Sequence, residues 1–258
     1  MLGVYFSGTG NSKHCVETFV MRYDKMGESV SIENKDALKY ILKHDFIVLG
    51  YPVYFSNAPK IVQDFINENG KVFKNKKIFI IATMATFSGD GTGCTARILK
   101  KYEADIVGGL HLKMPDSIGD EKVFKRDRNL NLKIINKSDL KIINSVQKLK
   151  SGNPTQDGLG IFAHIAGLLG QRLWFYNKTT SYKNMPKVDI QKCIGCNRCV
   201  KICSMKNLKL ENGKAISGNK CTLCYRCVNN CPTKALTILG KKVHKQYMIK
   251  DIFNEERN

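Results

Sequence analysis

The chain has 258 residues, of which 43 % are hydrophobic, so it is long enough for two domains that each bury a core. No apolar run reaches the roughly 20 residues that a membrane-spanning helix requires, which excludes a transmembrane segment at the sequence level. The formal net charge of +20 predicts an acidic partner, whereas the scattered lysines and the lack of a nucleic-acid motif predict no nucleic-acid partner.

The first predicted element is a buried strand at residues 2–6, which leads into the loop Ser7–Ser12 and then into a helix. A glycine- and hydroxyl-rich loop before a helix N-terminus can bind phosphate through backbone amides and hydroxyls. A Walker loop would need a terminal Gly-Lys-Ser/Thr, which is absent. A dinucleotide loop would need a third glycine where Lys13 stands, although Glu33 would suit its ribose-binding acid. The hydroxyl-rich loop that binds the terminal phosphate of flavin mononucleotide (FMN) fits best.

Strands and helices then alternate along the amino-terminal half, which predicts an α/β fold. We expect further strands near residues 29–33, 45–50, 77–83 and 105–112, and helices near 11–25, 57–69, 93–103 and 137–149. This pattern predicts a parallel sheet with helices on both faces, and with the preceding loop it resembles the doubly wound, five-stranded parallel sheet of a flavodoxin-like fold. In such a sheet a ligand binds at the carboxyl ends of the strands.

Two loops that follow the third and fourth strands combine aromatic and small residues. They cover residues 51–59 and 83–91. A flat flavin ring between two loops would need this composition, whereas ordinary surface loops with aromatics by chance are the alternative.

Residues 1–150 resemble the flavodoxin family, and this resemblance implies a set of FMN-binding residues. It implies that the phosphate is held by Ser7, Thr9, Gly10, Asn11 and Ser12. It also implies that one loop lines the ring with Pro52, Tyr54 and Asn57, and that the second loop contributes Thr83, Met84, Phe87 and Gly89.

Residues 151–185 are expected to form a linker that contains an apolar helix near residues 161–170. The stretch is too short to span a bilayer and is interrupted by His164. We expect this helix to pack between two domains; a helix that docks on a membrane surface or a partner is the alternative.

Eight of the ten cysteines lie between residues 193 and 231 and follow the spacing Cys-x2-Cys-x2-Cys-x3-Cys twice. Three thiolates from one tight loop and a fourth offset along the chain are typical of [4Fe–4S] ligation. Disulfides would need an oxidising compartment, whereas no signal peptide is recognised and we expect a cytoplasmic location. Structural zinc would leave the third and fourth cysteines of each run unexplained.

Residues 186–240 resemble a small α+β bacterial ferredoxin domain with two [4Fe–4S] clusters, followed by a tail at 241–258 that is expected to cap it. In the two-cluster pattern, the fourth cysteine of each run ligates the other cluster. One cluster would then be held by Cys193, Cys196, Cys199 and Cys231. The other would be held by Cys221, Cys224, Cys227 and Cys203.

The whole chain resembles a flavodoxin–ferredoxin fusion of the kind common in anaerobic bacteria. This resemblance implies an electron carrier that connects FMN, two clusters and an external redox protein. The alternative is a flavoenzyme that reduces a small molecule, for which the candidate proton donors are Tyr51, Tyr54, Asp90 and His111. A cluster-based sensor that binds nucleic acid is a third interpretation. Cys15 and Cys94 are expected to be buried and structural, and a homodimer is left open.

Overall fold

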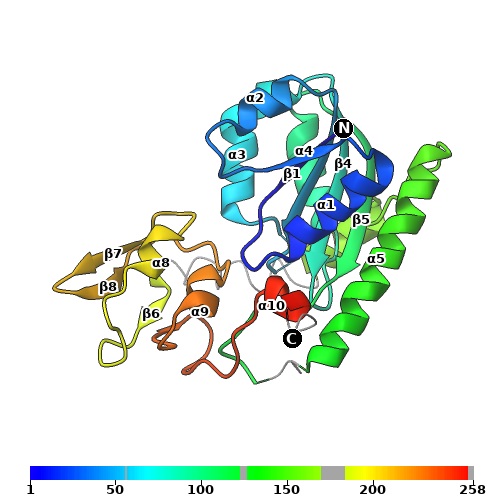
Figure 1. Cartoon of the computed structure of the whole chain (residues 1–258). Coiled ribbons are helices and arrows are strands. Elements are labelled where there is room, and N and C mark those ends of the chain that lie inside the picture. Colours follow the sequence, from blue (N-terminus) through cyan, green and yellow to red (C-terminus); the bar gives the residue numbers. More distant parts are fainter. Residues whose placement is uncertain (56, 123–126, 170–183, 255–258) are drawn as a thin grey trace. The chain divides into compact units, whose positions relative to one another are not determined.

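The computed structural model describes the chain except for residues 56, 123–126, 170–183 and 255–258 (Figure 1). Its described residues form two compact units, each built from several segments of the sequence. The first unit contains residues 1–7, 11–115 and 132–174, and the second contains 8–10, 116–131 and 175–258. The domain boundaries expected at residues 150, 185 and 240 stay predictions. Among the described helices, none combines the length and hydrophobicity needed to cross a membrane.

The first unit is built on a parallel five-stranded sheet with the order β2-β1-β3-β4-β5. The strands are β1 (Leu2–Tyr5), β2 (Glu28–Ser31), β3 (Phe46–Pro52), β4 (Lys77–Met84) and β5 (Asp105–Lys113). The central strands β3 and β4 are buried along most of their length because helices cover both faces of the sheet. The flavodoxin-like fold class predicted from the sequence is therefore confirmed.

Helices lie on both faces of this sheet, with α1 and α5 on one face and α3 and α4 on the other (Figure 1). Their bounds are α1 (Asn11–Tyr23), α2 (Ala37–Leu42), α3 (Lys60–Asn69), η1 (Gly70–Phe73), α4 (Gly91–Lys100), α5 (Arg128–Lys150) and α6 (Ile161–Gly167). Helix α3 begins after Pro59 rather than at residue 57, since a proline disfavours helical geometry in the residue before it. Helix α5 begins well before the expected residue 137, and the short α2 was not expected.

Helix α1 approaches the sheet closely at two glycines. A Cβ atom at Gly3 or Gly50, on the neighbouring strands β1 and β3, would collide with the Val16 side chain. One turn further along α1, the Phe19 ring stacks on Phe79 of β4 with 4.7 Å between centroids. These contacts fix the start of α1, and with it the loop that precedes the helix.

The second unit contains short elements joined by long loops. Its strands are β6 (Lys187–Val188), β7 (Leu208–Glu211), β8 (Lys214–Ser217) and β9 (Leu236–Thr237), and its helices are α8 (Arg198–Lys201), α9 (Arg226–Asn230) and α10 (Ile249–Asn254). Strand β6 pairs with β9, and β7 pairs with β8, both in antiparallel fashion. The carboxyl-terminal segment contacts α9, since the Gln246 side chain donates to the carbonyl oxygens of Val228 and Cys231.

We expect Gly50→Ala to lower the free energy of unfolding of the sheet domain by about 1–3 kcal/mol, because the added methyl group overpacks against Val16. Urea denaturation followed by far-ultraviolet circular dichroism measures this change. Gly160→Ala is the control, since a Cβ there would meet no atom within 4 Å. Equal stability of the two variants would show that the helix can move away at little cost.

Candidate functional site

The eight clustered cysteines line two separate hollows in the second unit. The first hollow is lined by Cys193, Cys196, Cys199 and Cys231. The second is lined by Cys203, Cys221, Cys224 and Cys227. The structure thus brings together the same two sets that the crossed cysteine pattern predicts. Ligation of a cluster by each set stays a proposal.

The two cysteine loops share an unusual backbone conformation. Gly195 and Asn197 of the first loop have positive φ angles, and so do their counterparts Leu223 and Tyr225, each 28 positions later. Such angles cost energy for residues other than glycine and persist where the surrounding structure enforces them. In each run the first three cysteines line one hollow and the fourth lines the other. This observation fits a pair of similar cofactors, one for each loop.

Backbone amides donate hydrogen bonds to cysteine sulfurs in both hollows. Asn207 N–H lies 3.2 Å from Cys203 Sγ, and Ala235 N–H lies 3.2 Å from Cys231 Sγ. Burial raises the pKa of the Cys221 thiol to about 12, which opposes the thiolate form. A bound iron ion would provide the positive charge that favours thiolate, and the amide donors would stabilise charge on the sulfurs. The donor set therefore fits iron–sulfur clusters.

A buried carboxylate supports the second cysteine loop. Asp120 is 2 % exposed and accepts hydrogen bonds from the Tyr225 hydroxyl at 2.9 Å and from the backbone amides of Ile238 and Leu239. Burial, together with the Asp120 charge, raises the pKa of Tyr225, so the phenol stays protonated and keeps donating. Tyr225 lies between two of the clustered cysteines, so Asp120 holds a loop that is distant in the sequence.

The loop between β1 and α1 has the features expected of a phosphate site. Gly10 has a φ angle of +98°, which favours glycine, and α1 begins at the next residue. The first amides of a helix lack intrahelical acceptors and can bind an anion. Ser7 is partly exposed and Thr9 is buried. The residues therefore fit an FMN phosphate through backbone amides and part of the predicted hydroxyl set.

Two of the predicted phosphate-binding side chains have partners within the protein. The Ser12 hydroxyl lies 2.7 Å from Thr83 Oγ1, and the Asn11 side-chain amide donates to the carbonyl oxygen of Pro115 at 2.8 Å. The first contact brings together a residue predicted for the phosphate and one predicted for the second ring loop. It connects the start of α1 to the carboxyl end of β4.

The ring loops place their predicted residues in different environments. Met84 is buried, Phe87 is 50 % exposed and Gly89 has a positive φ angle. Tyr54 and Asn57, which are partly exposed as is Pro52, exchange two backbone hydrogen bonds of 3.0 Å. Residue 56 lies outside the described part of the chain. Contact of these loops with a flavin ring stays a proposal.

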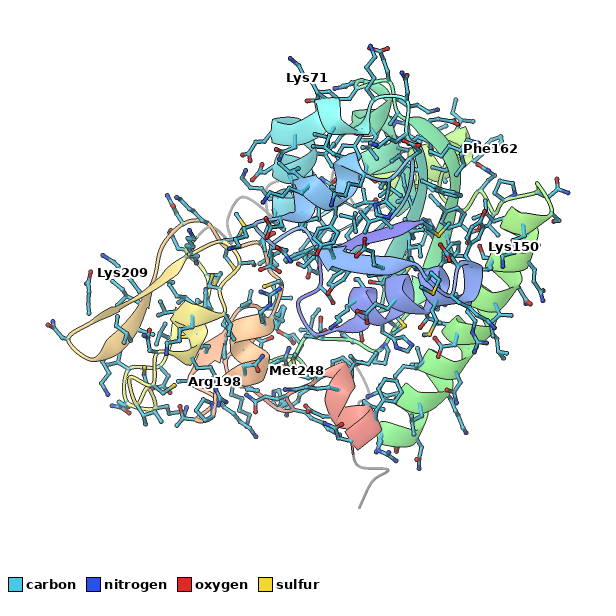
Figure 2. All side chains as sticks on the ribbon, turned by 45° about the horizontal axis from the view of Figure 1, so that its top comes forward. Lys71, Lys150, Phe162, Arg198, Lys209 and Met248 are labelled. Carbon is cyan, nitrogen blue, oxygen red and sulfur yellow. The ribbon has the colours of Figure 1, made fainter. Side chains whose placement is uncertain are left out.

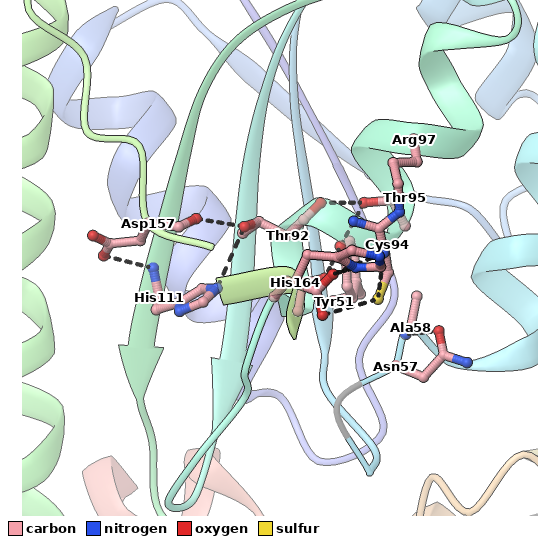
Figure 3. A network of polar contacts seen from close by, with 12 residues as sticks. Tyr51, Asn57, Ala58, Thr92, Cys94, Thr95, Arg97, His111, Asp157 and His164 are labelled. Atoms are coloured by element: carbon pink, nitrogen blue, oxygen red, sulfur yellow. Dashed lines mark hydrogen bonds and ion pairs between the residues drawn. The ribbon is translucent and has the colours of Figure 1, made fainter. Parts of the chain in front are cut away.

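A polar network lies at the base of the second ring loop and α4 (Figure 3). Asp90 is fully buried, and its Oδ2 lies 2.8 Å from Arg97 Nη2 and 2.9 Å from His164 Nδ1. His164 therefore connects α6 to this loop. Arg97 was not among the residues predicted from the sequence, although its spacing of seven residues from Asp90 was a readable signal. On the same helix as His164, the Phe162 side chain is exposed (Figure 2).

Three of the four candidate proton donors, Tyr51, Asp90 and His111, have different environments around this network. The Tyr51 hydroxyl is buried against Gly91 and Thr95, and burial raises its pKa. Asp90 is enclosed by the basic groups of Arg97 and His164. His111 instead borders an open cavity, and its ring nitrogen lies 3.0 Å from the Ser88 hydroxyl. Burial lowers the pKa of His111, so the ring is neutral at pH 7.

The two remaining cysteines are both buried. Burial, reinforced by the nearby Asp139 charge, raises the pKa of Cys15, which makes this thiol unreactive. Cys94 lies in the network of Asp90 and Arg97.

Comparisons with known proteins agree with this division of sites. Residues 2–120 match the family model for a flavodoxin domain, and residues 192–236 match that for a 4Fe-4S dicluster domain. Ferredoxin-2 of Desulfomicrobium norvegicum is 52 % identical over 29 residues, which cover 11 % of this chain and 49 % of the ferredoxin. The chain thus spans about half the length of this curated relative.

Similar solved structures include two flavodoxins. The two-electron reduced flavodoxin of Megasphaera elsdenii has a TM-score of 0.40 and 20 % identity, and the match covers 55 % of this chain and 99 % of that one. Flavodoxin 2 from Bacillus cereus has a TM-score of 0.43 and 19 % identity, with 58 % and 97 % covered.

We expect Asp120→Asn to destabilise the second unit by about 2–4 kcal/mol, because it removes a buried charge that accepts three hydrogen bonds. Anaerobic urea unfolding followed by the visible absorbance of the clusters measures the change. Asp251→Asn, which removes the same charge from an exposed side chain on α10, is the control. Coincident unfolding curves would contradict the role given to Asp120.

Proposed function

Since the chain carries a flavodoxin domain and a 4Fe-4S dicluster domain, which imply FMN and iron–sulfur clusters, we propose that it is a cytoplasmic electron carrier. It passes electrons between FMN, two [4Fe–4S] clusters and an external acidic redox protein. Bound FMN would supply one- and two-electron exchange, and each cluster would supply one-electron exchange. The combination would allow electron pairs to be divided into single electrons.

The observation that carries this proposal is the grouping of the cysteines. Four thiols border each of two hollows, and both hollows lie in the unit that contains the dicluster match. The amides of Asn207 and Ala235 would stabilise negative charge on the sulfurs, which favours the reduced state. The Ser7–Ser12 loop and the start of α1 would hold the FMN phosphate.

An anaerobic reductive titration of the purified protein, followed by absorbance and electron paramagnetic resonance, tests the proposal. We expect about eight irons and one FMN for each chain, with flavin and clusters reduced in a connected sequence. Protein that retains both clusters but has no affinity for added FMN would contradict the flavin assignment.

The crossed ligation makes a specific prediction for cysteine variants. Cys231→Ser should perturb the same cluster as Cys199→Ser, and Cys203→Ser should perturb the same cluster as Cys227→Ser, because each pair borders one hollow. Iron content and the paramagnetic resonance of the reduced variants measure the effect. If ligation were not crossed, Cys231→Ser would instead match Cys227→Ser.

One observation favours a second candidate function, a flavoenzyme that reduces a small molecule. A cavity of about 820 Å³ borders the second ring loop, and its lining includes Met84, Phe87, His111 and Lys137. This volume lies in the range of small-molecule sites. Of the four candidate proton donors, His111 is the one that lines it.

If His111 donates the proton in such a reduction, the rate should fall as pH rises through its pKa, which burial lowers from 6.5. The donor form is present below that pKa and is lost above it. His111→Gln should remove this pH step and lower the rate at least about 100-fold. Steady-state reduction of quinones and nitroaromatics across pH measures both effects. An unchanged profile in the variant would exclude His111 as the donor.

A further inference from the structure

Five lysines gather around one groove of the second unit. The groove has a volume of about 280 Å³, and the lysines that line it are Lys187, Lys192, Lys234, Lys241 and Lys242. All five are exposed. Basic side chains project widely from this unit, as Arg198 and Lys209 show in Figure 2, but here they surround a single concave surface.

The positive charge of the groove is largely uncompensated. Asp189 is the acidic residue of the lining, and it is engaged by the Lys192 ammonium group at 2.6 Å and by the amides of Gln191 and Lys192. Within the described part of the chain, the other four lysines form no ion pair. A concentration of one charge sign in a concave surface attracts a partner of the opposite sign and accelerates its encounter.

The groove adjoins the first cysteine hollow. Val188 and Ala235 line both spaces, and β6 pairs with β9 in this region, so the groove and the hollow share part of their walls. Cys196 of the first hollow is exposed, whereas the four cysteines of the second hollow are buried or half-buried. A partner that binds in the groove would therefore lie closer to the first hollow than to the second hollow.

Two exposed apolar side chains lie in the same stretch of chain. Ile190 is 60 % exposed and Ile194 is 64 % exposed, and they flank Lys192 in the sequence. Apolar residues beside a group of like charges suit a transient protein interface. The charges guide the approach of the partner, and the apolar contacts hold the two protein surfaces close together.

We propose that this lysine groove is the docking surface for an acidic redox protein, and that electrons enter or leave the chain through the cluster site of Cys193, Cys196, Cys199 and Cys231. This inference rests on the proposed electron-transfer function. In the outward direction one electron passes to a one-electron acceptor in the partner, which is reduced while this protein is oxidised. No covalent bond forms or breaks.

The test is anaerobic stopped-flow electron transfer from the reduced holoprotein to an acidic rubredoxin, compared with a basic cytochrome c. We expect the second-order rate constant with rubredoxin to fall steeply as salt rises. Lys241→Glu/Lys242→Glu should lower that rate constant at least about tenfold at low salt and flatten its salt dependence. The rate with cytochrome c should not fall in this variant.

Lys133→Glu/Lys148→Glu is the matched control, because it makes the same change in net charge at two exposed positions of α5. We expect this pair to lower the rubredoxin rate less than about twofold. Equal effects of the two double variants would overturn the groove proposal and leave only a general attraction by net charge.

Further outcomes separate the proposals from each other. A wild-type holoprotein that reduces neither acceptor would contradict the electron-transfer function itself. Wild-type transfer that is unaffected by Lys241→Glu/Lys242→Glu would overturn the docking surface alone. Fluorescence anisotropy with a short DNA duplex completes the test: if the groove variant loses DNA binding but keeps the rubredoxin rate, the groove is a nucleic-acid surface.

Discussion

The geometry of the two cysteine loops is the constraint on which the second unit depends. Each loop presents its first three thiols to one hollow of its own. Each loop contains left-handed turns, and most of the residues at these turns are not glycine. Such turns are costly, so other parts of the fold must hold them. Asp120 does this for the second loop by accepting hydrogen bonds from Tyr225 and from two amides next to β9.

The first unit solves a different problem, since it has to keep loops at one end of a sheet in place. Close packing of Val16 on Gly3 and Gly50 fixes α1, and the Ser12–Thr83 contact connects the start of that helix to β4. The buried Asp90 joins α4 to α6 through Arg97 and His164. Loops anchored in this way can bind a flat cofactor without a large ordering cost.

Parts of this architecture could be predicted because their signals are local. Apolar runs marked the five strands, and the spacing of the cysteines marked the two loops. Helix α2 was missed because six residues contain too few turns to show a periodicity. The side chains of Asn11 and Ser12 also contact groups distant in the sequence, which no local pattern reveals, and their contact with phosphate stays a prediction.

By itself, the sequence determined the fold class of the first unit, the two cysteine sets and the overall positive charge, since period, spacing and composition are properties of short segments. Only the tertiary structure decided which of the four candidate proton donors borders a cavity, and that Asp120 supports Tyr225. It also decided which lysines line one groove. Antiparallel pairing of β6 with β9 brings Lys187 and Lys192 beside Lys234, Lys241 and Lys242, and such long-range pairing leaves no local pattern in the chain.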